Sequence, residues 1–308
     1  MGKLLTILGG GENFSPLSIG NLELWLDGAD ESTKTYSFWN PFYTVSGTQG
    51  TTVLTASADA SGILDSDMII RVGASDVYAV DSVSGTTINI KSSLTTDYTD
   101  VSMYRKNISA WNDKSPQANN SVQYNETYQP IALSASKNVR FDNDFLDTVN
   151  NSNITGNPDF TVCMVHKLNE TEGGSYGGWF GWGPATSGEV AFCGRGLNTE
   201  SKYALGFLGA GNDGGTLDTN LNCLTWLREG GANGGHTGNT LYKNGSELSL
   251  GNVMGGTSVN LTATPYKIGR NINGGILNEI SEILVFSKKL SDLDRVGVET
   301  YLRKKWGV

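Results

Sequence analysis

The chain has 308 residues, a formal net charge of −9 and 40 glycines. At this length it can bury a full hydrophobic core, as one large β domain or as two smaller ones. A glycine content about twice the usual ~7% favours many short strands joined by tight turns over long helices. The acidic balance argues against non-specific binding to DNA or RNA, which requires a basic face.

Residues 1–20 precede the first predicted strand and form an arm. Its large apolar side chains are Leu4, Leu5, Ile7, Leu8, Phe14 and Leu17. Because an isolated apolar arm cannot fold alone, two interpretations remain open: a solvated tail, or an arm that anchors the protein by docking on a neighbouring subunit. The first residues are apolar over too few positions to make a secretory signal, and no segment approaches transmembrane length.

The strand pattern starts with the alternating leucines of LELWLDGAD (Leu22–Asp30) and continues through an insert. Residues 35–107 are too long and too patterned for a loop. We therefore expect them to form an inserted small β-barrel or β-sheet module, with residues 21–34 and 108–308 forming the main domain. The strand-like runs of the insert are Thr51–Ala56, Met68–Val72, Val77–Val83, Thr86–Lys91 and Val101–Arg105.

Strand patterns resume at Ile108 and continue towards the end of the chain. In Phe160–His166 both alternating faces are partly apolar, as in a central strand. Asn244-Gly245 lies between two strand-like runs and is the strongest short signal for a hairpin turn. Ile276–Phe286 is rich in isoleucine, leucine and valine, which predicts a buried strand.

A helix is predicted after this strand. The Ser291 hydroxyl can cap its first turn, acidic residues follow at Asp292 and Asp294, and Gly307 can end it. The last turn is basic, as the helix dipole favours, with Arg303, Lys304 and Lys305. A buried strand followed by a short capped helix indicates the closing edge of a β-sandwich.

Six segments share their order with one family: LELWLDGAD (Leu22–Asp30), ISAWNDKS (Ile108–Ser115), YQPIAL (Tyr128–Leu133), VRFDNDFL (Val139–Leu146), DFTVCMVHKL (Asp159–Leu168) and NTLYKNGSEL (Asn239–Leu248). With the C-terminal strand and helix, they resemble the LamG-like jelly roll of the concanavalin A-like lectin/glucanase superfamily. No single motif is specific, so the resemblance rests on their order. It implies an all-β jelly-roll sandwich of roughly a dozen strands, into which the small β module is inserted.

Sugar binding requires exposed aromatic faces and a few fixed polar groups. The candidates are Trp179 and Trp182 in GGWFGWG, and Trp39 and Tyr43 in YSFWNPFY. The alternative is a packing role, because aromatic residues of β-proteins usually lie in the core. For the second group this would mean packing of the insert on the sandwich.

Some relatives in this superfamily hydrolyse β-glucans, so the resemblance makes a glycoside hydrolase one of the alternatives. Their acid and nucleophile lie on one face of one strand, and the comparable strand here carries Glu279 and Glu282. Because strand side chains alternate, residues three apart are expected on opposite faces. That arrangement would exclude the ~5 Å carboxylate pair of a retaining glycosidase.

No cofactor is expected, and calcium is the one candidate. The resemblance brings calcium in, because some LamG-like domains bind it at a loop rim, and oxygen-rich turns occur at Asn212-Asp213 and at Asp142 and Asp144. Their spacing matches no known calcium loop, so turn formation is the favoured interpretation. The cysteines Cys163, Cys193 and Cys223 are scattered, which predicts small buried side chains rather than a disulfide or metal set.

Domains that resemble this one and begin with an LWLDA-type segment are frequent in phage virions. The resemblance therefore implies a non-enzymatic virion structural protein, displayed in repeated copies or as a homo-oligomer on a phage capsid or tail. Its expected partners are other virion proteins and host-surface glycans, and neither nucleic acid nor membrane. The alternatives are a free carbohydrate-binding lectin and a glycoside hydrolase.

Overall fold

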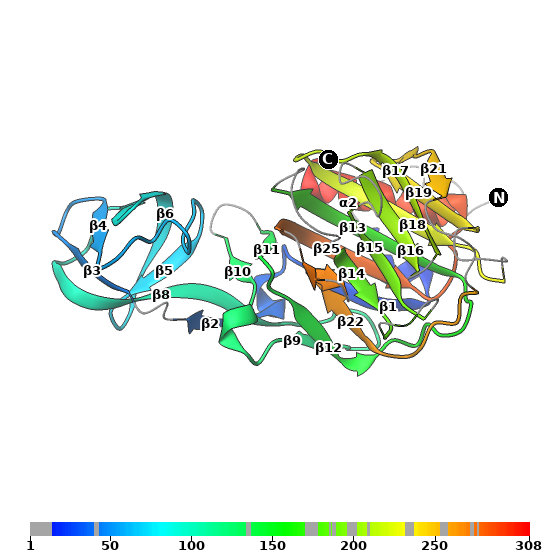
Figure 1. The fold of residues 1–308 in the computed structure, drawn as a ribbon, viewed down its shortest axis with the longest axis horizontal. Coiled ribbons are helices and arrows are strands. Elements are labelled where there is room, and N and C mark those ends of the chain that lie inside the picture. Colours follow the sequence, from blue (N-terminus) through cyan, green and yellow to red (C-terminus); the bar gives the residue numbers. More distant parts are fainter. Residues whose placement is uncertain are drawn as a thin grey trace.

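The computed structural model describes residues 14–39, 43–133, 137–169, 178–184, 186, 189–195, 202–207, 210–231, 237–252, 258–271, 274–275 and 277–308. The chain forms a two-layered β-sandwich at one end of the molecule and a small barrel at the other (Figure 1). The predicted fold class, an all-β jelly-roll sandwich with an inserted small β-barrel or β-sheet module, is confirmed, and the module is a barrel.

One layer of the sandwich, the helix-side sheet, is built around the buried strand β25. Strand β25 pairs with β1, β11 and β13, and the sheet continues through β18 and β19 to β20. The strands are β1 (Leu22–Asp27), β11 (Val139–Phe141), β13 (Phe160–Leu168), β18 (Leu221–Arg228), β19 (Asn239–Lys243), β20 (Ser246–Glu247) and β25 (Asn278–Phe286). The predicted Asn244-Gly245 turn joins β19 and β20.

The other layer, the distal sheet, runs in the pairing order β9, β12, β22, β14, β15, β16, β17, β21. Its strands are β9 (Ser121–Val122), β12 (Leu146–Asn151), β14 (Gly178–Trp182), β15 (Ala191–Arg195), β16 (Lys202–Phe207), β17 (Ala210–Thr216), β21 (Leu250–Asn252) and β22 (Pro265–Ile268). A separate two-stranded ribbon pairs β23 (Arg270–Asn271) with β24 (Gly274–Gly275). The main hydrophobic core draws side chains from both sheets and contains most of the buried aromatic side chains among the described residues.

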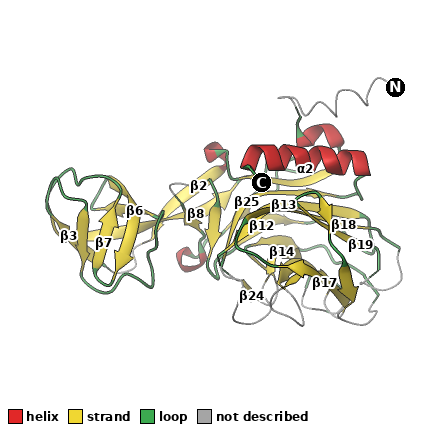
Figure 2. Cartoon of the chain, turned by 90° about the horizontal axis from the view of Figure 1, so that it is seen from above, coloured by secondary structure: helices red, strands yellow, loops and turns green. Residues whose placement is uncertain are grey.

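Helix α2 (Asp292–Trp306) covers the outer surface of the helix-side sheet, as Figure 2 shows. The Ser291 hydroxyl accepts a hydrogen bond from the Asp294 N–H at 3.2 Å, and Gly307 ends the helix in the left-handed conformation. Both predicted caps are therefore confirmed. Beneath the helix, Val298 and Leu302 pack with Leu284 and Phe286 in a second core. The short helix η1 (Pro16–Ile19) precedes β1.

The barrel is a closed ring of strands. Its pairing order is β3, β4, β7, β6, β5, β8 and back to β3, so no strand has a free edge. The strands are β3 (Thr44–Gly47), β4 (Val53–Ala56), β5 (Ile69–Val72), β6 (Asp76–Ser84), β7 (Thr87–Ile90) and β8 (Tyr98–Trp111). Its core is aliphatic, apart from Tyr78 and Tyr98, and is separate from the sandwich cores.

The long strand β8 connects the two regions. It closes the barrel at its start and then pairs with β2 (Lys34–Trp39), with β10 (Ile131–Ala132) and with β9 of the sandwich. It thus passes without a break through Asn107, where the sequence placed the end of the insert. Ile131 of β10 also belongs to the barrel core, so the sandwich segment contributes one buried side chain to the barrel. The remaining short helices are η2 (Glu31–Thr33) and η3 (Glu126–Tyr128).

Candidate functional site

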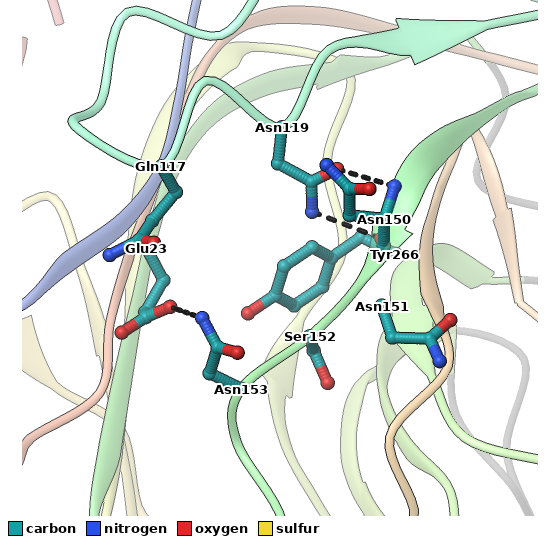
Figure 3. A pocket seen from close by; sticks show the side chains of 8 residues that line it. All are labelled: Glu23, Gln117, Asn119, Asn150, Asn151, Ser152, Asn153 and Tyr266. Atoms are coloured by element: carbon teal, nitrogen blue, oxygen red, sulfur yellow. Dashed lines mark hydrogen bonds between the residues drawn. The ribbon is translucent and has the colours of Figure 1, made fainter.

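A polar pocket of about 180 Å³ lies at one end of the sandwich. It is lined by Glu23, Gln117, Asn119, Asn150, Asn151, Ser152, Asn153 and Tyr266, which come from four separate stretches of the chain (Figure 3). Five of the eight side chains are amides and only one carries a charge. The volume is below the ~300–1,000 Å³ typical of sites for drug-sized ligands, so the pocket has room for one small polar unit.

The loop that carries Gln117 and Asn119 is fixed by Asp113, the aspartate of the AWNDKS segment. One carboxylate oxygen of Asp113 accepts from the Trp25 N–H at 2.7 Å and from the Ser115 N–H at 2.8 Å. The other accepts from the Asn119 N–H at 2.8 Å and from the Ser115 hydroxyl at 2.7 Å. Asp113 is buried, so these four bonds hold the loop against β1 and place Asn119 at the pocket.

Asn119 in turn holds the asparagine-rich segment at the end of β12. Its side-chain N–H donates to the Asn150 carbonyl at 3.1 Å, and its side-chain oxygen accepts from the Asn150 N–H at 2.8 Å (Figure 3). Both functional ends of the Asn119 amide are thus occupied. The clamp sets the position of the following residues Asn151, Ser152 and Asn153, which line the pocket.

Glu23 reaches the pocket because β1 contains a bulge. Leu22 pairs with Phe286 and Leu24 with Val285, so Glu23 is the extra residue in β1. Its carboxylate accepts from the Asn153 side-chain N–H at 2.9 Å and from the Ser287 hydroxyl at 2.7 Å. Only 8% of Glu23 is exposed, so the negative charge lies on the inner wall of the pocket.

Two buried hydroxyls of the pocket have no hydrogen-bond partner among the described residues: those of Tyr266 and Ser152. Tyr266 is 1% exposed and Ser152 is 3% exposed. In Figure 3 the Tyr266 ring extends across the pocket, with its hydroxyl on the side of Glu23 and Asn153. Burial, with smaller contributions from Glu23 and Asp113, raises the pKa of Tyr266 well above its usual value, so the hydroxyl keeps its proton.

Unpaired buried hydroxyls are costly, which makes them informative. A buried polar atom without a partner costs roughly 1–3 kcal/mol, and such atoms in native proteins require an explanation. Here both residues belong to the lining of the same pocket, together with five amides and one carboxylate. The arrangement can hydrogen-bond a small ligand that carries several hydroxyl groups.

The prediction of sugar stacking on Trp179 and Trp182 requires a correction. Both side chains are 0% exposed and lie in the main core. Trp179 stacks on His166 at 4.5 Å between ring centroids, and Trp182 packs edge-on against Phe160 at 5.1 Å. With both rings covered by core residues, neither presents a face to a glycan, and the packing interpretation holds.

Trp39 and Tyr43 lie at the junction of the barrel and the ribbon formed by β2 and β8. Both are half-buried. The Arg105 guanidinium lies 4.8 Å from the centre of the Trp39 ring, and the Tyr43 hydroxyl donates to the Asp59 carbonyl at 2.9 Å. Neither lines the polar pocket.

The predicted arm lies only partly within the described residues. Leu4, Leu5, Ile7 and Leu8 lie outside them. Phe14 is half-buried and packs against Tyr301 of α2 at 5.7 Å between ring centroids, whereas Leu17 is 49% exposed. Residues from Phe14 onward therefore contact the sandwich of their own chain.

The two carboxylates of β25 are arranged differently from the prediction. Val165 pairs with Glu282 but His166 pairs with Ile280, so Ser281 is bulged out of register. Ile280 and Ile283 accordingly both face the main core, which places Glu279 and Glu282 on the same outer face. Gly28 fits against the bulge: a Cβ there would lie 2.5 Å from the Ser281 oxygen.

Despite sharing a face, these carboxylates have separate sets of donors. Glu279 accepts from Asn138 at 3.0 Å and from Arg140 at 3.1 Å. Glu282, 0% exposed, accepts from four donors: Trp25 Nε1 (2.8 Å), Tyr301 OH (2.9 Å), Lys305 Nζ (2.6 Å) and Trp306 Nε1 (2.7 Å). Three of these donors lie on or next to the last turns of α2, so Glu282 attaches the helix to the sheet.

The candidate calcium turns also form contacts of their own. Asn212 accepts from the Asn239 amide at 2.8 Å, and Asp213 lies 3.7 Å from Lys202. Asp144 is buried, faces Arg105 and accepts weakly from the Asp142 N–H at 3.4 Å. Within the described part of the chain, no group of three or more histidine, cysteine or acidic side chains gathers at one point.

No protein-family model matches the chain, and no curated protein matches it. Among solved structures, it is similar to the Trypanosoma rangeli sialidase, at 12% identity over 64% of this chain and 31% of that chain, with a TM-score of 0.43. It is also similar to the binding domain of Paraclostridial Mosquitocidal Protein 1 (12% identity, 61% of this chain, 49% of that chain, TM-score 0.37). A third similar structure is the binding domain of botulinum neurotoxin serotype D/C VPI 5993 (12% identity, 62% of this chain, 49% of that chain, TM-score 0.42).

These are distant similarities of fold. The matched region spans less than two thirds of the length of each of those chains. Among the described residues, no helix is both long enough and apolar enough to cross a bilayer.

Proposed function

We propose that this protein is a non-enzymatic virion structural protein, displayed on a phage capsid or tail, that binds a host-surface glycan through the polar pocket of its sandwich. The observation that carries the binding role is the pair of buried, unpartnered hydroxyls of Tyr266 and Ser152 in a pocket otherwise lined by amides and one carboxylate. The virion role is supported by the sequence resemblance.

The pocket chemistry favours a sugar over an apolar ligand. Typical small-molecule sites are lined mainly by apolar and aromatic side chains, whereas here Tyr266 is the only residue of the lining with a large apolar surface. A sugar ring offers hydroxyl groups in several directions, which amides can meet as both donors and acceptors. The Tyr266 hydroxyl would then gain the hydrogen-bond partner that it lacks among the described residues.

The decisive variant is Tyr266→Phe, which removes only the unpaired hydroxyl. If the hydroxyl serves the fold, the variant loses stability; if it serves a ligand, stability is unchanged or higher, because an unsatisfied buried group has been removed. We expect unchanged or raised thermal stability and a loss of glycan affinity of about 1 kcal/mol, roughly fivefold. Glycan-array binding followed by calorimetry on the best ligand measures the affinity.

Tyr203→Phe is the matched control. Tyr203 is also a fully buried tyrosine whose hydroxyl has no partner among the described residues, but it does not line the pocket. It should leave glycan affinity unchanged. Equal losses in both variants, or no glycan bound by the wild-type protein, would remove the proposed binding role.

The virion role is tested separately by mass spectrometry of purified particles and by removal of residues 1–13. This truncation retains Phe14, which packs against Tyr301, and removes Leu4, Leu5, Ile7 and Leu8. Fixed stoichiometry in particles, with incorporation lost and melting temperature unchanged in the truncated protein, supports the role. Absence from particles would leave a free lectin, and release of reducing sugar from a bound glycan would indicate a hydrolase.

A further inference from the structure

The charge in the polar pocket identifies the class of sugar that it accepts. Glu23 contributes a carboxylate to the wall, and the other seven lining residues are uncharged. Asp113, directly behind the loop of Gln117 and Asn119, adds a second buried carboxylate near the Tyr266 hydroxyl. The structure describes all eight lining residues, and none of them is a lysine or an arginine.

A basic residue, Lys288, directly follows Ser287, which donates a hydrogen bond to Glu23. Its ammonium group donates to the Ile19 carbonyl at 2.9 Å and lies 3.6 Å from Asp294 of α2. It is thus held by other groups. The whole chain adds to the same effect, because its net charge is −9.

The hydrogen bonds of Glu23 show that its oxygens already act as acceptors. Both of its partners, the Asn153 amide N–H and the Ser287 hydroxyl, donate to it. A ligand at this wall must therefore also donate, as a sugar hydroxyl can and a carboxylate or sulfate cannot. An anionic group would in addition be placed against the like charge of Glu23, which is only 8% exposed, and this is unfavourable.

We infer that the pocket binds a neutral sugar unit and rejects sugars that carry a carboxylate, such as sialic and uronic acids. This inference rests on the proposed glycan-binding function and specifies its substrate class. Glu23 is the specificity-determining residue: it accepts a ligand hydroxyl and excludes acidic sugars. Selection against an anion by a buried like charge is a form of discrimination by repulsion.

The experiment compares matched sugars that differ in one group. Methyl glucoside and methyl galactoside are each paired with the corresponding methyl uronide, in which the CH₂OH group is replaced by a carboxylate, and methyl sialoside is added. Binding of each to the wild-type protein is measured by saturation-transfer NMR and calorimetry at low ionic strength, where charge effects are least screened. We expect each neutral sugar that binds to exceed its uronide at least tenfold in affinity.

Glu23→Gln then tests the cause. Glutamine keeps the size of the side chain and one acceptor oxygen but removes the charge, so we expect the preference for the neutral sugar to fall at least tenfold. Glu126→Gln makes the same change of net charge at an exposed position outside the pocket and should leave the preference unchanged.

The outcomes separate the two proposals. Wild-type protein that binds a uronide or sialoside more tightly than the neutral sugars, or a Glu23→Gln variant with an unaltered preference, overturns the inference and leaves glycan binding standing. Binding of no sugar of either class overturns the proposed function and this inference with it.

Discussion

The barrel and the sandwich differ in how completely they satisfy their buried polar groups. Residues 43–104 are all described, and the only buried side-chain nitrogen or oxygen among them without a hydrogen-bond partner is Arg71 Nε. Even the two buried tyrosines of the barrel are paired: the hydroxyls of Tyr78 and Tyr98 lie 2.9 Å apart, and Tyr98 also donates to Asp76. The barrel interior thus combines aliphatic packing with a fully bonded polar pair.

The sandwich, in contrast, buries several polar atoms with no partner among the described residues. Besides Tyr266 and Ser152, they include the Tyr203 hydroxyl, the Trp179 indole nitrogen and both ring nitrogens of His166. Burial, reinforced by the nearby Lys243, lowers the pKa of His166 to about 3, so the ring stays neutral. Of these groups only Tyr266 and Ser152 line the pocket, and the proposed binding role of the sandwich concerns them alone, at a site of the kind where local rules are most often broken.

The two regions meet at a charged junction on β8. Arg105 donates to the Asn107 side chain at 3.0 Å and reaches the Ile63 carbonyl of the barrel at 3.4 Å. Arg140 of the sandwich pairs with Asp65 of the barrel at 3.0 Å. The difference between barrel and sandwich can therefore be tested by substitutions in the sandwich, in the barrel and at the junction between them.

The largest effect is expected from Glu282→Ala, which removes the acceptor of four donors under α2. Removing one side of a buried charged network costs about 3–5 kcal/mol, so the sandwich should be strongly destabilised. Residues 44–103 contain no tryptophan, and tryptophan fluorescence therefore reports on the sandwich and, through Trp39, on the junction, but not on the barrel core. Glu247→Ala, an exposed position on β20, is the control. A sandwich melting transition that stays in place would show that Glu282 does not hold the helix.

On the barrel side, Leu54→Ala removes a side chain that is 0% exposed in the barrel core. A buried leucine replaced by alanine costs about 2–5 kcal/mol, which we expect to unfold the barrel first. Glycan affinity and the tryptophan transition should remain as in the wild type, because the pocket lies in the sandwich. Val53→Ala, next to it but 40% exposed, should change little. If both transitions fall together, β8 and Ile131 couple the two regions into one folding unit.

At the junction, Asp144 should make stability depend on pH. Burial, opposed by Arg105, raises the pKa of Asp144 from 3.8 to about 7, and Asp142 is the other charged group that acts on it. Between about pH 4 and pH 7 the folded protein holds a proton that the unfolded chain releases, so stability falls as pH rises through this range. The loss is on the order of 1–4 kcal/mol. Asp144→Asn should flatten this dependence in denaturation curves between pH 4 and pH 8, and an unchanged slope would contradict the assignment.

The fold was predictable from the sequence because its signals are local. The Ser291 and Gly307 caps, the Asn244-Gly245 turn and the apolar run of β25 each require only neighbouring residues, and all are present in the structure. The inserted β module followed from short strand-like runs, but its closure into a barrel was left open, and β3 was missed because Thr44–Gly47 carries only one buried aliphatic side chain.

The pocket could not be predicted because it forms only when four distant stretches of the chain come together in the fold. Its residues come from β1, the loop after β8, the end of β12 and β22, and Tyr266 belongs to an ordinary core strand by its pattern. The asparagine-rich run Asn150–Asn153 was the one local signal that could have drawn attention to it. Two predictions were wrong for related reasons. Glu279 and Glu282 were expected on opposite faces, but the bulge at Ser281 breaks the alternation of the strand. Trp182 was expected to bind sugar, because the glycines around it are not typical of a core strand.

The smallest effect is expected from reductant and chelator, which should leave both regions unchanged. All three cysteines lie in the sandwich, and all are free and buried. Cys163 and Cys223 pack in the core beneath α2, while Cys193 belongs to the main core. Burial raises the pKa of the Cys193 thiol to about 12 and also raises the pKa of Cys223, which keeps the thiols protonated and unreactive.

We therefore expect the melting temperature to move by less than ~5 °C in dithiothreitol or in EDTA, within what about 1 kcal/mol explains. Iodoacetamide should label the native protein slowly and the unfolded protein at all three positions. A larger shift in EDTA alone would point to a calcium site at Asn212-Asp213 or Asp144, and the variants Asp213→Asn and Asp144→Asn would tell which of the two turns holds it. A shift in dithiothreitol alone would instead require a disulfide, which buried and protonated thiols do not form readily.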